Sequence, residues 1–300
     1  MTMTSDPPLI PRARSLFQRL GDWWRQYQPQ RGARSRGAIR CGDGHVALVG
    51  CGPGEPDLLT LRAVSRIERA DVLLYDRLTD PAILDRAPDA SERVYCGKRC
   101  GRHSMSQAQI NELLIERARL GQRVVRLKGG DPFIFGRGGE ELEACLGASI
   151  PCEVVPGVTA AIGCAATTGI PLTHRGVARA VTFVTGHCRD GNLPGVDWQG
   201  LVNDQQTLVF YMGLKHFDEL RQRLLDNGVP GSRPVAVIHN GTRNDQEVHR
   251  DRLDRVASEG AGNERPAVII VGGCVEALPV ADALLAAQPG GIPVDQAVSV

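Results

Sequence analysis

Short runs of β-branched and other apolar residues recur along residues 45–273, and segments with helical spacing lie between several of them. The runs predict strands at residues 45–50, 72–75, 93–96, 123–127, 152–156, 181–187, 206–213, 234–239 and 267–273. Helices are predicted over residues 58–70, 106–120, 142–146 and 251–257, with Ser106 as the N-cap of the second. Strands alternating with helices predict an α/β protein of two α/β domains whose sheets are mostly parallel or mixed.

The residue composition of the chain changes at three places. Small residues predominate from Gly157 to Gly176, which predicts a hinge over 157–179 between an N-terminal α/β domain, 45–156, and a C-terminal one, 180–278. Residues 1–44 hold eight arginines and one amphipathic patch, so we expect a flexible extension, with a docking helix or a transit peptide as alternatives. Residues 279–300 are predicted to form a flexible tail.

One loop stands out between the predicted strand 123–127 and the predicted helix 142–146. Residues 128–141 contain five glycines, the ionic residues Lys128, Asp131, Arg137 and Glu140, and three apolar residues between them. Glycine allows another group to approach the main chain closely, and open α/β sheets bind ligands at the carboxyl ends of their strands. The loop therefore predicts a ligand site, and the alternative is a tight connection with a charged rim.

Overall charge and cysteine content narrow the function class. The 35 Lys and Arg against 34 Asp and Glu give a net charge of +1, so nothing global favours nucleic acid or an anionic membrane. No apolar run approaches the ~20 residues of a membrane span. Most of the nine cysteines lie in apolar segments, which indicates reduced core residues of a cytoplasmic protein. The cluster Cys96, Cys100 and His103 lacks a second ligand pair, so no metal is expected.

A glycine-rich turn follows the first predicted strand. Gly50, Gly52 and Gly54, with an acid at Asp71 or Asp76, superficially match a dinucleotide-binding fingerprint. Pro53 lacks the N–H that would help hold a pyrophosphate, and Glu55 adds negative charge to the turn. The turn alone leaves the ligand class open.

Several single residues are candidates by position. Asp76 closes an apolar strand, where it serves as a general base, a ligand contact or a cap. Lys98 follows a strand and a glycine, a place where a solvated lysine is the simpler interpretation. Met212 ends a strong strand and fits a core or a pocket for a soft, flat cofactor. His174 suits a structural hydrogen bond, whereas Arg175 suits a carboxylate clamp.

Taken together, these motifs resemble the tetrapyrrole (precorrin) methyltransferases that use S-adenosylmethionine, and most closely the members that methylate uroporphyrinogen III. The resemblance covers about 46–278. It rests on ordered blocks at residues 49–54, 58–61, 75–78, 125–141, 155–160, 169–175 and 208–214. It implies two α/β domains with the active site in the cleft between them, working as a homodimer.

The resemblance also implies roles for individual residues. Residues matching those that hold S-adenosylmethionine, or its product S-adenosylhomocysteine, are Pro53, Gly129, Gly130, Asp131, Ile134, Thr159, Ala160, Met212 and Gly241. Asp76 and Lys98 match a proton acceptor and a proton donor, while Arg137, Glu140 and Arg175 match charged residues that face the tetrapyrrole. The chain departs from the family pattern at Glu55, Ile162, Thr167 and Gly176, and the last three lie on the expected tetrapyrrole side.

The expected activity is methylation of uroporphyrinogen III at C2 and C7. This gives precorrin-2 by way of precorrin-1, for siroheme, cobalamin or haem d1 synthesis. The expected partner is a small-molecule tetrapyrrole, whose carboxylates arginines at the site can bind, with no nucleic acid or membrane. Three alternatives remain: another precorrin methyltransferase, a nicotinamide-dependent oxidoreductase, and a tetrapyrrole-binding protein without activity.

Overall fold

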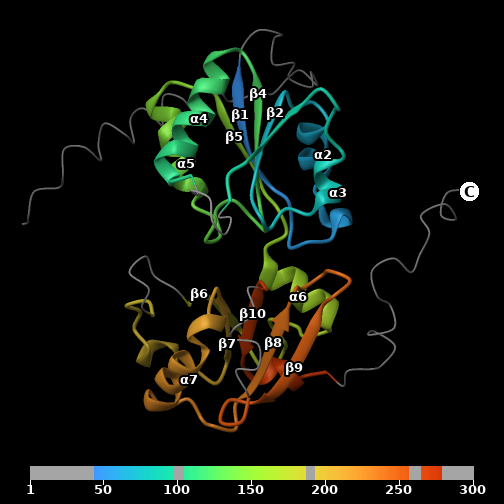
Figure 1. The fold of residues 1–300 in the computed structure, drawn as a ribbon. Helices are drawn as coiled ribbons and strands as arrows, with labels where there is room; N and C mark the ends of the chain where they lie inside the picture. The colour runs from blue at the N-terminus through green and yellow to red at the C-terminus, as the bar shows by residue number, and fades with distance from the viewer. Residues whose placement is uncertain (1–43, 98–104, 187–192, 257–264, 279–300) are drawn as a thin grey trace, which may run out of the picture. The chain divides into compact units, whose positions relative to one another are not determined.

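The computed structural model describes residues 44–97, 105–186, 193–256 and 265–278, which form two five-stranded sheets with their helices (Figure 1). Four subjects of the sequence predictions lie outside this part of the chain: the N-terminal extension, Lys98, the pair Cys100 and His103, and the C-terminal tail. No helix among the described residues has the length and apolar character needed to cross a membrane.

The first sheet is parallel throughout. Its strands are β1 (His45–Gly50), β2 (Val72–Tyr75), β3 (Glu92–Tyr95), β4 (Arg123–Lys128) and β5 (Cys152–Val155), in the order β3-β2-β4-β1-β5. All six residues of β1 are buried, as expected for a central strand covered on both faces. Because the strands run in one direction, the loops that follow β1, β2 and β4 emerge at the same edge of the sheet.

Helices cover both faces of this sheet (Figure 1). Helices α4 (Gln107–Arg119) and α5 (Gly138–Gly147) pack on one face, and α2 (Leu61–Ile67) and α3 (Pro81–Leu84) on the other. The prediction of Ser106 as an N-cap is confirmed, since its side chain accepts a hydrogen bond from Gln109 N and the Gln109 side chain accepts one from Ser106 N.

The second sheet is mixed. Its strands are β6 (Ala180–Thr185), β7 (Gln206–Tyr211), β8 (Pro234–His239), β9 (Glu247–Arg252) and β10 (Ala267–Val271), in the order β6-β7-β10-β8-β9. Only the β6–β7 pair is parallel among these strands. Helix α7 (Phe217–Asp226) packs on one face and α6 (Ala160–Thr168) on the other.

Two predicted helices differ from the structure. The helix predicted over 251–257 is wrong: its first residues belong to β9, an edge strand whose side chains alternate between exposed and partly buried. After β9 the chain makes a single turn, closed by a hydrogen bond from Val256 N to Arg252 O at 2.8 Å. Leu253 and Val256 lie in this turn, and both are buried. The helix predicted over 58–70 is interrupted, with the 3-10 helix η1 (Pro56–Leu58) ahead of α2.

The remaining 3-10 helices are short connections: η2 (Gln199–Leu201), η3 (Leu214–His216) and η4 (Gly273–Glu276). The six described cysteines, Cys51, Cys96, Cys145, Cys152, Cys164 and Cys274, are all unbridged and buried. The prediction that they are core residues is therefore confirmed for this part of the chain.

Candidate active site

Asp76 lies directly after β2, at the carboxyl edge of the first sheet. Its Oδ1 accepts a hydrogen bond from Leu78 N at 3.0 Å, and its Oδ2 lies 3.4 Å from the guanidinium of Arg126 on β4. The Asp76 side chain keeps 26% of its surface exposed, so a substrate can reach it. A carboxylate with fixed orientation and partial exposure has the properties of a general base.

Behind Asp76 lies a buried ionic network. Glu141 on α5 is fully buried; its carboxylate lies 3.3 Å from Arg126 Nε and 2.8 Å from Lys128 Nζ. Gln107 Nε2 adds a third hydrogen bond to the same carboxylate at 3.2 Å. Burial and the neighbouring Arg126 lower the pKa of Lys128. Burial also acts to lower the pKa of Arg126, but the nearby Glu141 and Asp76 carboxylates raise it overall.

The two glycine-rich segments predicted for the cofactor are joined by their main chains. Gly52 and Gly130 exchange two backbone hydrogen bonds, at 3.3 and 2.7 Å. The side chain of Asp131 accepts hydrogen bonds from Gly157 N at 3.1 Å and from Phe133 N at 2.9 Å. This glycine content serves close backbone packing, since a Cβ on Gly157 would lie 2.3 Å from Gly130 O.

The start of α6 is held by a side chain from β7. Thr159 occupies the N-cap position without capping through its own side chain. Instead the Tyr211 hydroxyl accepts a hydrogen bond from Ala161 N at 3.0 Å and bonds to the Thr159 hydroxyl at 2.7 Å. Met212, the next residue, has φ of +55° and an exposed side chain. The contacts therefore bring Thr159 and Ala160 beside the β7 end that carries Met212.

The loop after β8 packs tightly on α6. A Cβ added to Gly241 would lie 2.2 Å from Cys164 Sγ, so no larger residue fits there without movement. Burial raises the pKa of the Cys164 thiol to about 12, which leaves it neutral at pH 7 as an apolar packing surface. A Cβ on Gly163, one residue earlier, would lie 2.5 Å from Pro53, which puts Pro53 against the same helix.

Exposed apolar side chains gather in the predicted site segments. Among the described residues, five of the eight exposed large apolar side chains are Leu78, Phe133, Phe135, Ile162 and Met212. The Phe135 ring lies 5.1 Å from the Tyr211 ring, centroid to centroid. Uncovered apolar groups beside fixed backbone polar groups suit a ligand with a flat apolar body.

The charged residues predicted to face a substrate are arranged in different ways. Arg137 and Glu140 pair with each other through two hydrogen bonds of 2.8 and 2.7 Å, and both side chains are about half exposed. Arg175 is exposed in a turn closed by Val177 N and His174 O at 3.0 Å. Within the described residues, no hydrogen bond or ion pair joins Arg175 to the Asp76 network.

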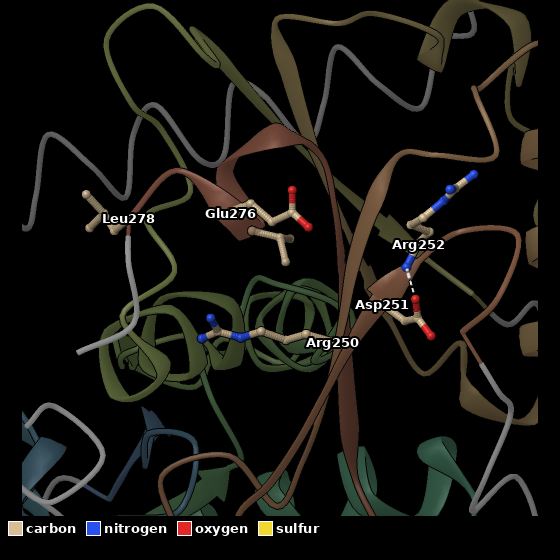
Figure 2. A pocket seen from close by; sticks show the side chains of 6 residues that line it. Arg250, Asp251, Arg252, Glu276 and Leu278 are labelled. Carbon is tan, nitrogen blue, oxygen red and sulfur yellow. Dashed lines mark hydrogen bonds between the residues drawn. The ribbon is translucent and has the colours of Figure 1, made fainter. Parts of the chain in front are cut away.

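The structure also contains a cavity that the predicted site residues do not line (Figure 2). It has a volume of about 400 Å³ and lies between β9 and the end of η4. Its lining consists of Arg250, Asp251, Arg252, Val275, Glu276 and Leu278. None of the predicted site residues belongs to this lining, so the cavity is not assigned to the active site.

The glycine turn after β1 lacks the geometry that binds a dinucleotide. In such folds the turn leads directly into a helix whose first N–H groups hold the pyrophosphate. Here α2 begins only at Leu61, and Cys51 N and Gly52 N already donate to Lys128 O and Gly130 O. The structure therefore gives no support to the nicotinamide alternative.

Residues 45–257 match the family model of Tetrapyrrole (Corrin/Porphyrin) Methylases. The chain belongs to this family. Its relatives include Siroheme synthase 1 of Aeromonas hydrophila subsp. hydrophila, 51% identical over 232 residues, which are 77% of this chain and 50% of that protein. The siroheme synthase of Methylococcus capsulatus is 54% identical over 233 residues, or 76% and 49% of the two chains. The chain thus spans about half the length of the siroheme synthases that it matches.

A solved structure from the tetrapyrrole methylases matches over its full length. The uroporphyrin-III C-methyl transferase of Thermus thermophilus, complexed with S-adenosylhomocysteine, is 39% identical to the chain with a TM-score of 0.67. The match covers 78% of this chain and 100% of the Thermus chain. The expected family and its two-sheet α/β fold are therefore confirmed.

In this tetrapyrrole methylase, the sequence analysis did not predict two features that orient candidate site residues: the Arg126–Glu141 ion pair and the Tyr211 hydroxyl. The sequence does contain a pattern that indicates the ion pair: Arg126 and Lys128 are two residues apart on a buried strand, so their side chains lie on one face of the sheet. Two buried cations on one face require acidic partners. Tyr211 gave no comparable signal, since its hydroxyl caps a helix that begins 51 residues earlier, at Ala160.

Proposed function

We propose that the chain transfers methyl groups from S-adenosylmethionine to C2 and C7 of uroporphyrinogen III, giving precorrin-2 by way of precorrin-1. The observation that carries this proposal is the match to the whole length of a uroporphyrin-III C-methyl transferase at 39% identity. The product would enter siroheme, cobalamin or haem d1 synthesis, and siroheme agrees with the names of the relatives.

The residues present fit S-adenosylmethionine. Gly129, Gly130, Asp131 and Ile134 would hold it from the loop after β4, and Pro53, Thr159, Ala160, Met212 and Gly241 from the segments packed around α6. The exposed thioether of Met212 offers a soft, uncharged surface next to a sulfonium. When bound, S-adenosylmethionine supplies a methyl group that is already activated on sulfur, so transfer to carbon depends chiefly on alignment. Among the described residues, no cluster of His, Cys, Asp or Glu has the makeup of a metal site.

Asp76 is the group proposed to move a proton. Transfer of a methyl cation from the sulfonium to a substituted pyrrole carbon leaves a positive charge on the tetrapyrrole. This charge is removed when a proton leaves another position of the substrate, and Asp76 Oδ2 is a partly exposed acceptor for that proton. Arg126 restrains this carboxylate from behind, where it is itself held by the buried Glu141. Arg137 and Arg175 offer exposed guanidinium groups to substrate carboxylates, Arg137 by exchanging its pairing with Glu140. Lys98 is proposed as the proton donor from the family pattern alone.

We further propose that the protein works as a homodimer in the cytoplasm, with the active site between two α/β domains, 45–156 and 180–278, joined by a hinge at 157–179. Six buried, unbridged cysteines support a reducing compartment. Sedimentation at micromolar concentration tests the dimer, and a monomer would contradict it.

The experiment for the reaction is an anaerobic incubation with S-adenosylmethionine and uroporphyrinogen III, followed by mass spectrometry of the tetrapyrrole. We expect a gain of two methyl groups. Binding of S-adenosylhomocysteine without methyl gain would exclude this substrate and favour a different precorrin. Binding of uroporphyrinogen III without turnover, in the presence of bound S-adenosylmethionine, would indicate a protein without activity.

A further inference from the structure

The side chain of Gln246 connects the loop after β8 to helix α6. Its Oε1 accepts two hydrogen bonds, one from Thr242 N and one from the Thr167 hydroxyl, each at 2.8 Å. Thr242 belongs to the loop and Thr167 to the last turn of α6. One oxygen atom therefore joins two segments that are 75 residues apart in the chain.

The loop that Gln246 holds is strained. Asn240 and Thr242 flank Gly241 and have φ of +46° and +70°, a region that residues with a Cβ rarely adopt. Such conformations cost about 1–3 kcal/mol each and persist only where several contacts fix them. The side chain of Thr242 is also fixed, because its Oγ1 accepts a hydrogen bond from Glu55 N at 3.1 Å. Gln246 is thus one of the contacts that maintain the main-chain conformation around Gly241.

Helix α6 is the common support of this part of the site. It begins at Ala160, next to Thr159, and Cys164 on its second turn lies under Gly241. Tyr211 fastens the start of the helix to β7, and Gln246 fastens its end to the loop after β8. The spacing between Gly241 and the start of α6 therefore depends on both fastenings.

We propose that Gln246, acting with Thr167, is a positioning residue for S-adenosylmethionine: it fixes the main chain of Gly241 against α6 in the cofactor-binding conformation. This inference rests on the proposed function, since it assumes that Gly241 contacts the cofactor. It also gives a role to Thr167, one of the positions where the chain departs from the family pattern.

The test compares Gln246→Leu with Gln246→Glu. Leucine has similar size but accepts no hydrogen bond, which leaves the Thr242 N–H without its acceptor. Glutamate keeps an oxygen in the same place and can accept both bonds. Calorimetry measures the Kd for S-adenosylhomocysteine, and initial rates give KM for S-adenosylmethionine and kcat. Gln222→Leu is the matched control, because Gln222 is an exposed glutamine on α7 whose side chain donates a hydrogen bond to Asp226 in the same helix.

We expect Gln246→Leu to raise the Kd for S-adenosylhomocysteine and the KM for S-adenosylmethionine about tenfold, or about 1.4 kcal/mol. At saturating cofactor, kcat should change less than about twofold, and Gln246→Glu and Gln222→Leu should bind within about threefold of the unmodified chain. Thr167→Val should weaken binding in the same direction, while Thr167→Ser should not.

Two results would overturn the inference. If Gln246→Leu lowers the thermal midpoint but binds S-adenosylhomocysteine as the unmodified chain does, Gln246 has a structural role only. If Gln246→Glu is impaired as much as Gln246→Leu, the acceptor oxygen is not what matters. Failure of the unmodified chain to bind S-adenosylhomocysteine would refute the proposed function and this inference together, which separates that outcome from the other two.

Discussion

Replacing Glu141 by Gln tests the buried network behind Asp76. The change keeps the shape of the side chain but removes the negative charge that lies between Arg126 and Lys128. Arg126 retains Asp76 as a partner, whereas Lys128 loses its counterion at a site where only 4% of its surface is exposed. Breaking a buried ion pair from one side costs about 3–5 kcal/mol. Because the Gln amide can still accept one hydrogen bond, we expect the lower figure, about 3 kcal/mol.

The loss should depend on pH in a specific direction. The pKa of Lys128 is already lowered in the folded protein, and Glu141 is one of the groups that oppose this lowering. Between this lowered pKa and the unfolded value of about 10.4, the unfolded chain binds more protons, so stability rises with pH. Without Glu141 the folded pKa falls further and the window begins at a lower pH. The stability difference between variant and unmodified chain should therefore shrink as pH rises from 7 to 10.

The assay is thermal unfolding of both proteins at several pH values. A loss of about 3 kcal/mol corresponds to a midpoint lower by about 6–12 °C in a chain of this size. Glu143→Gln is the control, since Glu143 lies exposed on the same helix and its replacement should change stability by less than about 0.5 kcal/mol. If Glu141→Gln matches Glu143→Gln at pH 7, or if its deficit grows with pH, the described charge network does not stabilise the fold.

Three further variants test other parts of the site. Asp76→Asn should slow methylation by roughly 10²-fold with unchanged calorimetric affinity for S-adenosylhomocysteine, and near-normal turnover would exclude Asp76 as the base. Tyr211→Phe should cost about 1–3 kcal/mol in urea unfolding, because Ala161 N loses its acceptor and Thr159 its partner; a neutral result would show that water replaces the hydroxyl. Gly241→Ala should destabilise by about 1–3 kcal/mol through its contact with Cys164, and Cys164→Ala should restore part of the loss. Additive effects of that pair would contradict the predicted clash.

The sequence was most informative where one local signal decided the structure. The apolar runs at β1, β4 and β8 are long and β-branched, so strand was the only reasonable prediction. The Ser106 capping box is likewise local, since all its hydrogen bonds lie within four residues. Helix α7 is absent from the sequence-based predictions, although Phe217, Leu220 and Leu224 have helical spacing and are buried.

Pairings between distant residues could not be predicted in the same way. Strand β9 has the sequence Glu-Val-His-Arg-Asp-Arg, which is too polar to suggest a strand, and its conformation comes from pairing with β8. The ion-pair partner of Asp76 could not be predicted either, because Arg126 is 50 residues away in the chain and no pattern in a single sequence links the two residues. Candidate site residues were thus accessible through family resemblance, whereas the contacts that orient them required coordinates.

Backbone strain links the fold to the proposed chemistry. Six described residues other than glycine have positive φ, and five of them, Phe135, Arg137, Met212, Asn240 and Thr242, lie in segments predicted to bind cofactor or substrate. Each costs about 1–3 kcal/mol, which the four buried apolar clusters of the two sheets must offset. Substitution by glycine would relieve that cost, so a chain selected for stability alone would favour it at these positions. At Thr242 the side chain has a structural role, since it accepts a hydrogen bond from Glu55 N. At Met212, whose side chain is exposed, we expect replacement by glycine to relieve the strain and to weaken the affinity for S-adenosylhomocysteine.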